Sequence, residues 1–293
     1  MNDVSIIIVS YNTRDLTVDC IKSIHETVRG LQYEIIVVDN ASTDGSVEAI
    51  KEQFKEVVVI SNDKNLGFGA ANNLGIQVSD AKYIFLLNSD TRLINDAVSC
   101  LYKYAENDQG KRGFYGCNLY DNALSPHYSY GNYPRMLSLL FDLGLSKIFR
   151  SYYNRNIKLE VCRELQQVEE VDYVCGAAMF SERDLLLQLG GFDETFFLYF
   201  EETDLCYRAW KLGLKNKIIP DAKIIHLAGR SSSGQPVLRK TLIREKSRLH
   251  FYYKRYGRLA MPFVKALIAA GYLKEFMLRR DRNSLKVIKT IIN

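Results

Sequence analysis

The sequence predicts an α/β fold in which a mostly parallel sheet carries helices on both faces. Short apolar segments rich in β-branched residues occupy positions 4–10, 34–40, 57–61 and 83–90, and each ends in polar residues. Continuous apolar runs of this length are typical of strands that are buried on both faces of a parallel sheet. Segments with helical spacing alternate with these strands, which favours right-handed strand–helix–strand units.

Between the predicted strands, apolar residues recur at helical spacing. Residues 13–28 place Leu16, Cys20 and Ile24 on one stripe, and residues 45–54 show the same helical spacing. Both segments are therefore expected as helices that cover the sheet.

The second half of the chain is less regular. Residues 170–229 predict another strand and a helix from about Glu182 to Leu189. Residues 121–165 are rich in Tyr, Asn and Ser and have no clear period. We expect an irregular excursion there, with one short helix around residues 136–149.

Composition narrows the class of protein. The 293 residues are 47% hydrophobic and 25% charged, as in a globular protein. The N-terminal segment MNDVSIIIVSYN lacks a basic region, so no signal peptide is expected. The six cysteines show no CxxC spacing, which favours small buried side chains in a reducing cytosol.

The net charge of +5 is distributed unevenly. Residues 240–293 carry 14 Lys/Arg and 3 Asp/Glu, a balance of +11, whereas residues 1–239 carry 25 and 31, a balance of −6. We expect a catalytic domain over residues 1–239 and a basic amphipathic helical tail over 240–293. Nucleic acid is not an expected partner, because the acidic body would repel its phosphates.

The tail has two interpretations. Its apolar segment 259–273 is shorter than the roughly 20 residues that span a membrane. Flanking aromatic and basic residues are typical of a segment that lies in a membrane interface and meets anionic lipid. A pair of helices packed on the domain, or on the second subunit of a homodimer, explains the same pattern.

Polar residues follow the predicted strands. Asp39, Asn40, Asn88 and Asp90 fall at carboxyl ends of strands, where ligands of such sheets collect. A carboxylate in this place, as in NSD at 88–90, can hold a divalent cation that bridges two phosphates. Taken alone, it is also a common turn or cap residue.

An acidic cluster opens the segment FEETDLCYRAWKLG at residues 200–213. Acids in the first turn of a helix are stabilised by its dipole, and Asp204 can pair with Arg208 four residues on. This explanation does not cover Glu201 and Glu202, which follow the apolar run FFLYF. We therefore expect these two adjacent carboxylates to be functional.

The motifs VSIIIVSYN, VVDNASTDGS, NLGFGAANN, LLNSDT, GGFDETFFLYFEETDLCYR and IIHLAGRSS occur in this order. Over about residues 4–256 the chain resembles the GT-A-fold, inverting glycosyltransferases of family 2, most of all the rhamnosyltransferase-like branch that builds bacterial surface polysaccharides. The resemblance implies a Rossmann-like nucleotide-binding sheet and transfer of a sugar from dTDP-rhamnose or a UDP-sugar. It further implies a lipid-linked or polysaccharide acceptor and a cytoplasmic enzyme at the inner face of the cell membrane.

The resemblance also assigns residues. Donor contacts are implied at strand ends and loops: Ser10, Tyr11, Asn12, Asp39, Asn65, Gly67, Asn88, Ser89 and Asp90. Because Asn88 replaces the first acid of the DxD motif, Asp90 is the expected main ligand of Mg²⁺ or Mn²⁺. His226 matches a position that contacts metal or diphosphate in some relatives, and Arg230 is expected to assist.

In the family, the second acid of an ED pair is the general base. The match puts this role on Glu202, and its longer side chain leaves Glu201 as an alternative. An apolar wall and a second carboxylate are expected to raise the pKa of the base towards neutrality. Asp204 and Arg208 are expected to support the site.

Two other functions stay open at this point. A nucleotidyltransferase also places acids at strand ends, but it normally has a basic glycine-rich loop after the first strand, and SYNTRDLT has none. A catalytically inactive nucleotide-binding scaffold is compatible with Asn88 and with the replacement at Glu202. It predicts nucleotide binding without metal-dependent turnover.

Overall fold

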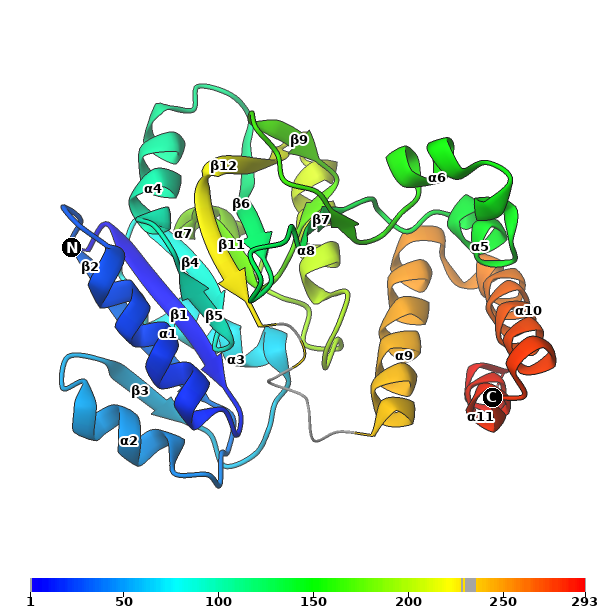
Figure 1. Ribbon diagram of the computed structural model, residues 1–293, viewed down its shortest axis with the longest axis horizontal. Coiled ribbons are helices and arrows are strands. Elements are labelled where there is room, and N and C mark those ends of the chain that lie inside the picture. Colours follow the sequence, from blue (N-terminus) through cyan, green and yellow to red (C-terminus); the bar gives the residue numbers. More distant parts are fainter. Residues whose placement is uncertain (1, 228, 230–235, 293) are drawn as a thin grey trace.

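The computed structural model describes residues 2–227, 229 and 236–292. Within these residues, a nine-stranded mixed sheet has the order β3-β2-β1-β4-β11-β6-β12-β5, and β9 pairs with β12 (Figure 1). Its parallel part holds β1 (Val4–Ser10), β2 (Tyr33–Asp39), β3 (Val58–Ser61) and β4 (Tyr83–Asn88). The four strands expected from the sequence are confirmed, with ends that differ by two residues at most.

The predicted helices are confirmed as well. They are α1 (Arg14–Thr27), α2 (Ser46–Gln53) and α7 (Arg183–Gln188). The structure adds α3 (Phe68–Val78), α4 (Ala97–Asn107) and α8 (Glu201–Lys211).

Helices cover both faces of the sheet, as expected. One buried cluster joins the sheet to α1, α2 and α4, and the other joins it to α3, α7 and α8. The β-branched residues of β1 explain this, because their side chains point alternately to the two clusters, as Ile6 and Ile7 do.

The remaining strands make the sheet mixed. They are β5 (Thr91–Leu93), β6 (Arg112–Tyr120), β9 (Glu169–Val171), β11 (Ala178–Glu182) and β12 (Lys215–His226). Strand β11 runs antiparallel to β4 and β6, while β12 runs parallel to β6 and antiparallel to β5.

The excursion is more ordered than the sequence indicated. It contains β7 (Tyr128–Gly131), α5 (Met136–Asp142), the 3₁₀ turn η1 (Leu145–Lys147), α6 (Arg150–Asn156) and β8 (Val161–Cys162). With β10 (Tyr173–Val174), strands β7 and β8 form a second, three-stranded sheet. The short helix expected around residues 136–149 is confirmed as α5, but it stops before Gly144, whose φ of 127° is unsuited to a helix, and η1 and α6 follow as separate segments.

The tail forms three α-helices where a pair was expected. These are α9 (Val237–Tyr256), α10 (Met261–Arg279) and α11 (Arg282–Ile292), with the 3₁₀ turn η2 (Arg258–Ala260) between the first two. Gly257, with a φ of 76°, ends α9. The expected boundary at 239/240 falls inside the first turn of α9.

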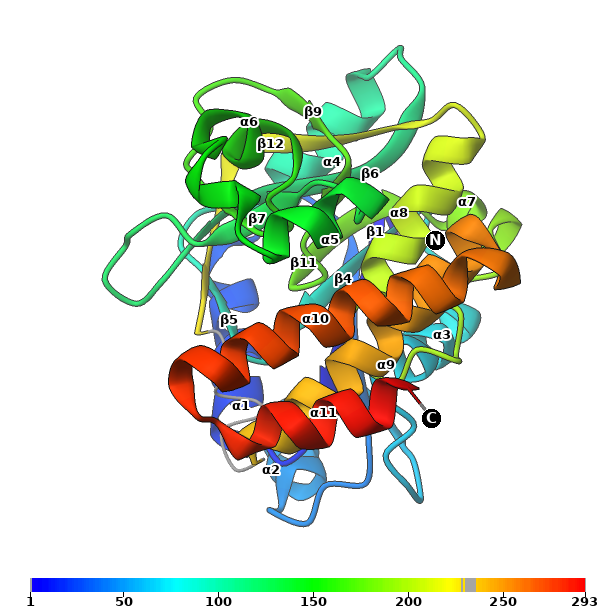
Figure 2. The same ribbon diagram turned by 90° about the vertical axis from the view of Figure 1, so that its right-hand side faces the viewer.

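The tail helices share a small core with the excursion. Buried Leu139 of α5 packs with Tyr252 of α9, Val264 and Ile268 of α10 and Val287 of α11. In Figure 2, α10 and α11 lie on the face turned to the viewer, with α5 beside α10. Within the described residues, no helix is both long and apolar enough to cross a membrane.

The six cysteines are free thiols. Four of them, Cys20, Cys117, Cys175 and Cys206, are buried as expected, and Cys100 is partly buried. Cys162 is exposed, so the expectation is wrong there: the residue ends the short strand β8 at the surface.

Candidate active site

The carboxyl ends of β1, β2 and β4 meet at one edge of the main sheet. In register, Ser10 lies beside Asp39, and Val9 lies beside Asn88. Asp39 is buried, and its Oδ2 accepts a hydrogen bond of 2.8 Å from the Ser42 amide. Its Oδ1 receives no hydrogen bond within the described chain, so a donor from a ligand would satisfy it.

The loop after β1 is tied to the loop after β2. Asn12 has a φ of 53°, and its Oδ1 accepts a hydrogen bond of 2.8 Å from the Thr43 amide. Ser10 is buried, and its hydroxyl lies 3.2 Å from that of Thr13. Tyr11 is half-buried between them. These residues form the loop at the carboxyl end of β1.

The turn at Asn65 and Gly67, which precedes α3, packs against another part of the chain. Gly67, with a φ of 90°, lies so close to the Phe197 carbonyl that a Cβ would clash with it. Its amide donates to Asn65 Oδ1 over 2.9 Å. The space next to Gly67, which the resemblance implied as a donor contact, is therefore filled by the chain itself.

A cavity of about 640 Å³ opens beside this edge. Among its lining residues are five of the sequence-predicted positions: Asn88, Asp90, Glu201, Glu202 and His226. The remaining predicted donor contacts are not among them, namely Ser10, Tyr11, Asn12, Asp39, Asn65, Gly67 and Ser89. Ser89 is buried, and its hydroxyl accepts a bond of 3.1 Å from Thr13.

Asp90 and His226 form a pair in this cavity. They come together because His226 at the end of β12 is in register with Thr91 of β5. His226 Nε2 lies 3.4 Å from the buried Asp90 Oδ1, and the Leu227 amide donates to the Asp90 carbonyl over 2.8 Å. The neighbouring Asn88 Oδ1 is buried and accepts no hydrogen bond within the described residues.

The Asp90–His226 pair fits a divalent cation. Two adjacent ligands of an octahedral Mg²⁺ or Mn²⁺ are about 3 Å apart, because each bond is ~2.1 Å long. In the described part of the chain, no group of three or more His, Cys, Asp or Glu could hold a metal. Asp90 and His226 would thus offer two ligand atoms to an ion here, and other ligands would have to complete its coordination.

His127 is a cavity residue that the sequence reasoning missed. Its ring contacts that of His226 edge to face, with centroids 5.6 Å apart. Burial lowers the pKa of His127, and His226 lowers it further. The residue lies in the excursion, and only the pairing of that segment with the rest of the chain brings it to the site.

Glu201 and Glu202 follow a strained turn. Tyr199 and Phe200 both have a φ of 69°, a left-handed conformation that costs a non-glycine residue about 1–3 kcal/mol. Helix α8 starts directly afterwards, so its first two side chains are the glutamates. Strain of this kind is concentrated at functional sites, which supports the functional interpretation of the pair.

The two carboxyl groups differ in their environment. Burial raises the pKa of Glu202 to about 7, and the charge of Glu160 adds to the shift. Burial and the charge of Glu202 raise the pKa of the buried Glu201 well above its usual range. Burial thus favours the neutral form of both side chains, most strongly that of Glu201, so Glu202 is the candidate proton acceptor in the cavity.

Asp204 and Arg208 hold α8 in place. Arg208 Nε donates to Asp204 Oδ2 over 2.7 Å, which confirms the pairing expected from their spacing. Arg208 also donates to the carbonyls of Leu189 and Gly191, over 2.6 and 2.7 Å. Both side chains act on the position of α8 and are not among the lining residues of the cavity.

Helix α9 supplies one wall of the cavity, which the sequence did not indicate. Arg244, Glu245 and Arg248 line it, although all three belong to the predicted tail. Gly229 lines it too, whereas Arg230 lies outside the described residues.

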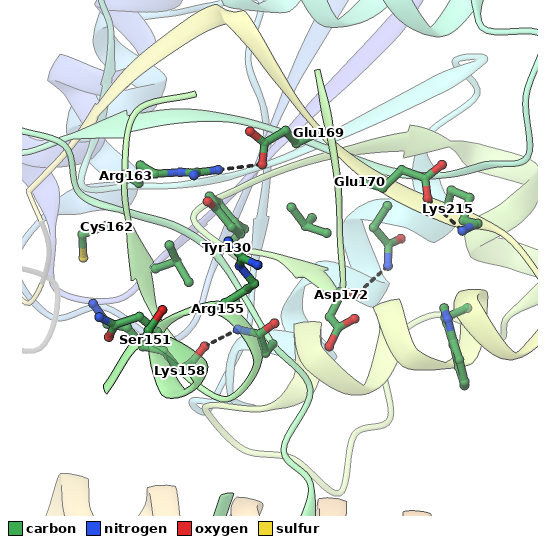
Figure 3. A pocket seen from close by; sticks show the side chains of 17 residues that line it. Tyr130, Ser151, Arg155, Lys158, Cys162, Arg163, Glu169, Glu170, Asp172 and Lys215 are labelled. Atoms are coloured by element: carbon green, nitrogen blue, oxygen red, sulfur yellow. Dashed lines mark hydrogen bonds and ion pairs between the residues drawn. The ribbon is translucent and has the colours of Figure 1, made fainter. Parts of the chain in front are cut away.

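A second cavity of about 840 Å³ lies between α6, β8, β9 and the start of β12 (Figure 3). Many of its charges are paired with each other. Arg163 bonds Glu169 over 2.6 Å, and Lys215 bonds Glu170 over 2.8 Å. None of the predicted site residues lines it, so the smaller cavity is the candidate active site.

Comparison with known sequences agrees with this site. Residues 5–183 match the family described as Glycosyl transferase family 2. The N-acetylglucosaminyl-diphospho-decaprenol L-rhamnosyltransferase of Mycobacterium tuberculosis (strain H37Rv) is 26% identical over 216 residues, which are 69% of either chain. Rhamnosyltransferase WbbL of Escherichia coli K12 is 28% identical over 240 residues, 77% of this chain and 83% of WbbL.

Solved structures share the fold. The mannosyltransferase PcManGT from Pyrobaculum calidifontis, solved with GDP-Man and Mn²⁺, aligns over 99% of this chain and 73% of its own, with a TM-score of 0.57 and 16% identity. GalNAc-T7, solved with UDP, GalNAc and Mn²⁺, aligns over 87% of this chain with a TM-score of 0.58 and 15% identity. This chain covers 51% of GalNAc-T7, about half of its length.

The likeness to these structures confirms the predicted GT-A fold, with C-terminal helices added to it. The family match covers more than half of the chain and includes the strand ends that carry Asp39 and Asp90. The protein therefore belongs to glycosyl transferase family 2 and resembles rhamnosyltransferases among its relatives.

Proposed function

We propose that this glycosyltransferase inverts the anomeric centre of a nucleoside diphosphate-sugar, dTDP-rhamnose or a UDP-sugar, as it transfers the sugar to a hydroxyl of a lipid-linked glycan. The proposal rests on one observation: Glu202 and the Asp90–His226 pair line the same cavity. Burial raises the pKa of Glu202 to about 7, which suits a general base. Rhamnose is supported by the names of both relatives, and a lipid diphosphate acceptor by the name of the Mycobacterium tuberculosis enzyme alone.

Glu202 is the proposed general base. Its carboxylate takes the proton of the acceptor hydroxyl as that oxygen attacks the anomeric carbon from the side opposite the leaving diphosphate. Burial favours the neutral, already protonated form of Glu201, which is why Glu202 is the preferred candidate for this role. The strained turn at Tyr199 and Phe200 fixes where the helix presents both side chains.

On the donor side, Asp90 and His226 would hold Mg²⁺ or Mn²⁺. When bound, the ion would stabilise the negative charge that develops on the leaving diphosphate. Asp39, with its unsatisfied Oδ1, is placed at the sheet edge where it can accept a hydrogen bond from the nucleoside. Ser10 and Asn12 keep the loops at this edge in position.

Calorimetric titration with dTDP, UDP, GDP and ADP, with and without Mn²⁺, tests the donor site. We expect one pyrimidine diphosphate to bind tightly in the presence of metal and the affinity to fall in Asp90→Ala. The anomeric configuration of the product, read by NMR, tests inversion. Absence of nucleotide binding under both conditions would refute the proposed donor site.

We also propose that the protein works at the inner face of the membrane, bound to anionic lipid. Exposed apolar side chains gather in the tail, where Leu259 is 96% exposed and Leu278 is 73% exposed. Ile148 of the excursion is 74% exposed, and α5 of the same excursion packs against α10. Together with the basic excess of residues 240–293, these side chains suit an anionic membrane interface.

A further inference from the structure

Helix α9 brings positive charge into a cavity that is otherwise acidic. Six carboxyl residues line the cavity: Asp90, Asp142, Glu160, Glu201, Glu202 and Glu245. Arg244 and Arg248, one turn apart on α9, are the only Lys or Arg that line it within the described residues. An anionic ligand in this part of the cavity would have to meet these two guanidinium groups.

The two arginines are held differently. Arg248 is largely buried and is engaged twice, by Asp142 and by Glu245 Oε2 at 3.6 Å. Its charge is therefore compensated within the protein. By pairing with Asp142, Arg248 holds α9 against the excursion, and α9 is the helix that also carries Arg244.

Arg244 remains available to a ligand. Its side chain is 54% exposed, and the only carboxylate within ion-pair distance in the described chain is Glu245, 3.9 Å from its Nε. Charge-assisted N–H···O bonds are about 2.7–2.9 Å long, so this contact is not a close ion pair. The hydroxyl of Tyr272 is a hydrogen-bonding neighbour of Arg244, but a neutral hydroxyl does not compensate the charge of the guanidinium. Arginine suits phosphate because its planar group donates two parallel hydrogen bonds.

We propose that Arg244, supported by Arg248, forms a metal-independent anion site for the diphosphate of a lipid-linked acceptor. The inference rests on the proposed function, in which the donor diphosphate occupies the Asp90–His226 end of the cavity. A second diphosphate would be repelled by the ionised carboxylates of this cavity unless a cation met it. Helix α9 also leads from the cavity to α10, whose exposed apolar residues are suited to lipid.

The direct test is calorimetric titration with inorganic pyrophosphate in EDTA. The wild type should bind pyrophosphate without metal, Arg244→Gln should bind at least tenfold more weakly, and Asp90→Asn should bind like the wild type. Lys246→Gln is the matched control, because it removes an exposed positive charge from the same helix outside the cavity. Binding that needs Mn²⁺ and is lost in Asp90→Asn would assign the anion to the donor site and overturn the proposal.

A kinetic test distinguishes the acceptor from the donor. For Arg244→Gln, the KM for a prenyl diphosphate-linked N-acetylglucosamine should rise at least tenfold with little change in kcat. The KM for the alkyl glycoside of the same sugar, which has no phosphate, should not change. Equal effects on both acceptors, or a raised KM for the donor, would contradict the proposal.

Failure of the proposed function has a separate signature. If the wild type transfers sugar to neither acceptor, the proposed function is wrong, whereas the pyrophosphate titration in EDTA still reports on the anion site. If transfer occurs but Arg244→Gln binds pyrophosphate like the wild type, only the anion site is refuted.

Discussion

Lys254 Nζ of α9 lies 2.7 Å from Asp204 Oδ1 of α8, the helix that begins with the two glutamates of the candidate active site. The same Asp204 accepts from Arg208 at its other oxygen, and Lys254 also bonds Asp193 over 2.7 Å. Ion pairs thus connect α9 to α8, the helix that carries Glu202.

Replacing Lys254 by methionine should loosen this connection. Hydrogen bonds to charged groups contribute about 1.5–3 kcal/mol, and the buried Asp204 would lose one of its two partners. We expect the free energy of unfolding in urea to fall by roughly 2 kcal/mol. Lys246→Met, an exposed change on the same helix, should leave it nearly unchanged, and an equal loss in both variants would contradict this role of Lys254.

Glu202→Gln should abolish transfer without loss of donor binding. A general base contributes about 10²–10⁴-fold to the rate, and glutamine cannot take the proton. We expect kcat to fall by at least 100-fold, by the same reasoning, while the Kd for the nucleotide stays within about twofold. Glu201→Gln preserves a neutral side chain and should be far milder. If Glu201→Gln is instead the inactive variant, the base is Glu201.

The pH profile should report the ionisation of Glu202. Because the base must be charged and its pKa is about 7, kcat/KM should decrease about tenfold per pH unit below neutrality. The charge of Glu160 contributes to raising this pKa, so Glu160→Gln should move the acidic limb to lower pH. Initial rates at saturating metal would show the shift, and a limb that stays in place would mean that another group sets it.

Polar substitutions on the exposed face of α10 should weaken binding to anionic vesicles. Met277 and Leu278 are 60% and 73% exposed, so Met277→Ser with Leu278→Ser removes apolar area without opening the core. Co-sedimentation with phosphatidylglycerol vesicles should fall several-fold.

Leu212→Ser is the control for the vesicle experiment, because Leu212 is an exposed apolar residue at the end of α8 and does not belong to the tail. Unchanged sedimentation of the tail variant, together with a dimer that dissociates in light scattering, would assign this face to a second subunit.

The sequence predicted the parallel half of the fold because its signal is local. A strand such as Val4–Ser10 is apolar throughout because both of its faces are buried, and the polar residue that follows marks the strand end. The glutamate pair was found because a helix start does not explain two acids after an apolar run. The resemblance to a known family then supplied the roles.

The features that the sequence did not predict depend on contacts between segments that are distant in the chain. Tyr133 of the excursion is buried, and it packs there against Tyr207 and Trp210 of α8. Arg244 reaches the cavity because α9 docks beside α8, and nothing in its neighbourhood in the sequence signals this. A charge count could separate residues 240–293 from the rest, but it could not show that α9 forms part of the site.

The core shared by α5 and the tail has a consequence for protein engineering. Leu139 closes a cluster to which all three C-terminal helices contribute, so neither segment has a complete hydrophobic interior without the other. A chimera with a related enzyme that exchanges only the last fifty residues would pair mismatched surfaces. A viable exchange must therefore replace the excursion and the tail together, although two separate stretches of the gene encode them.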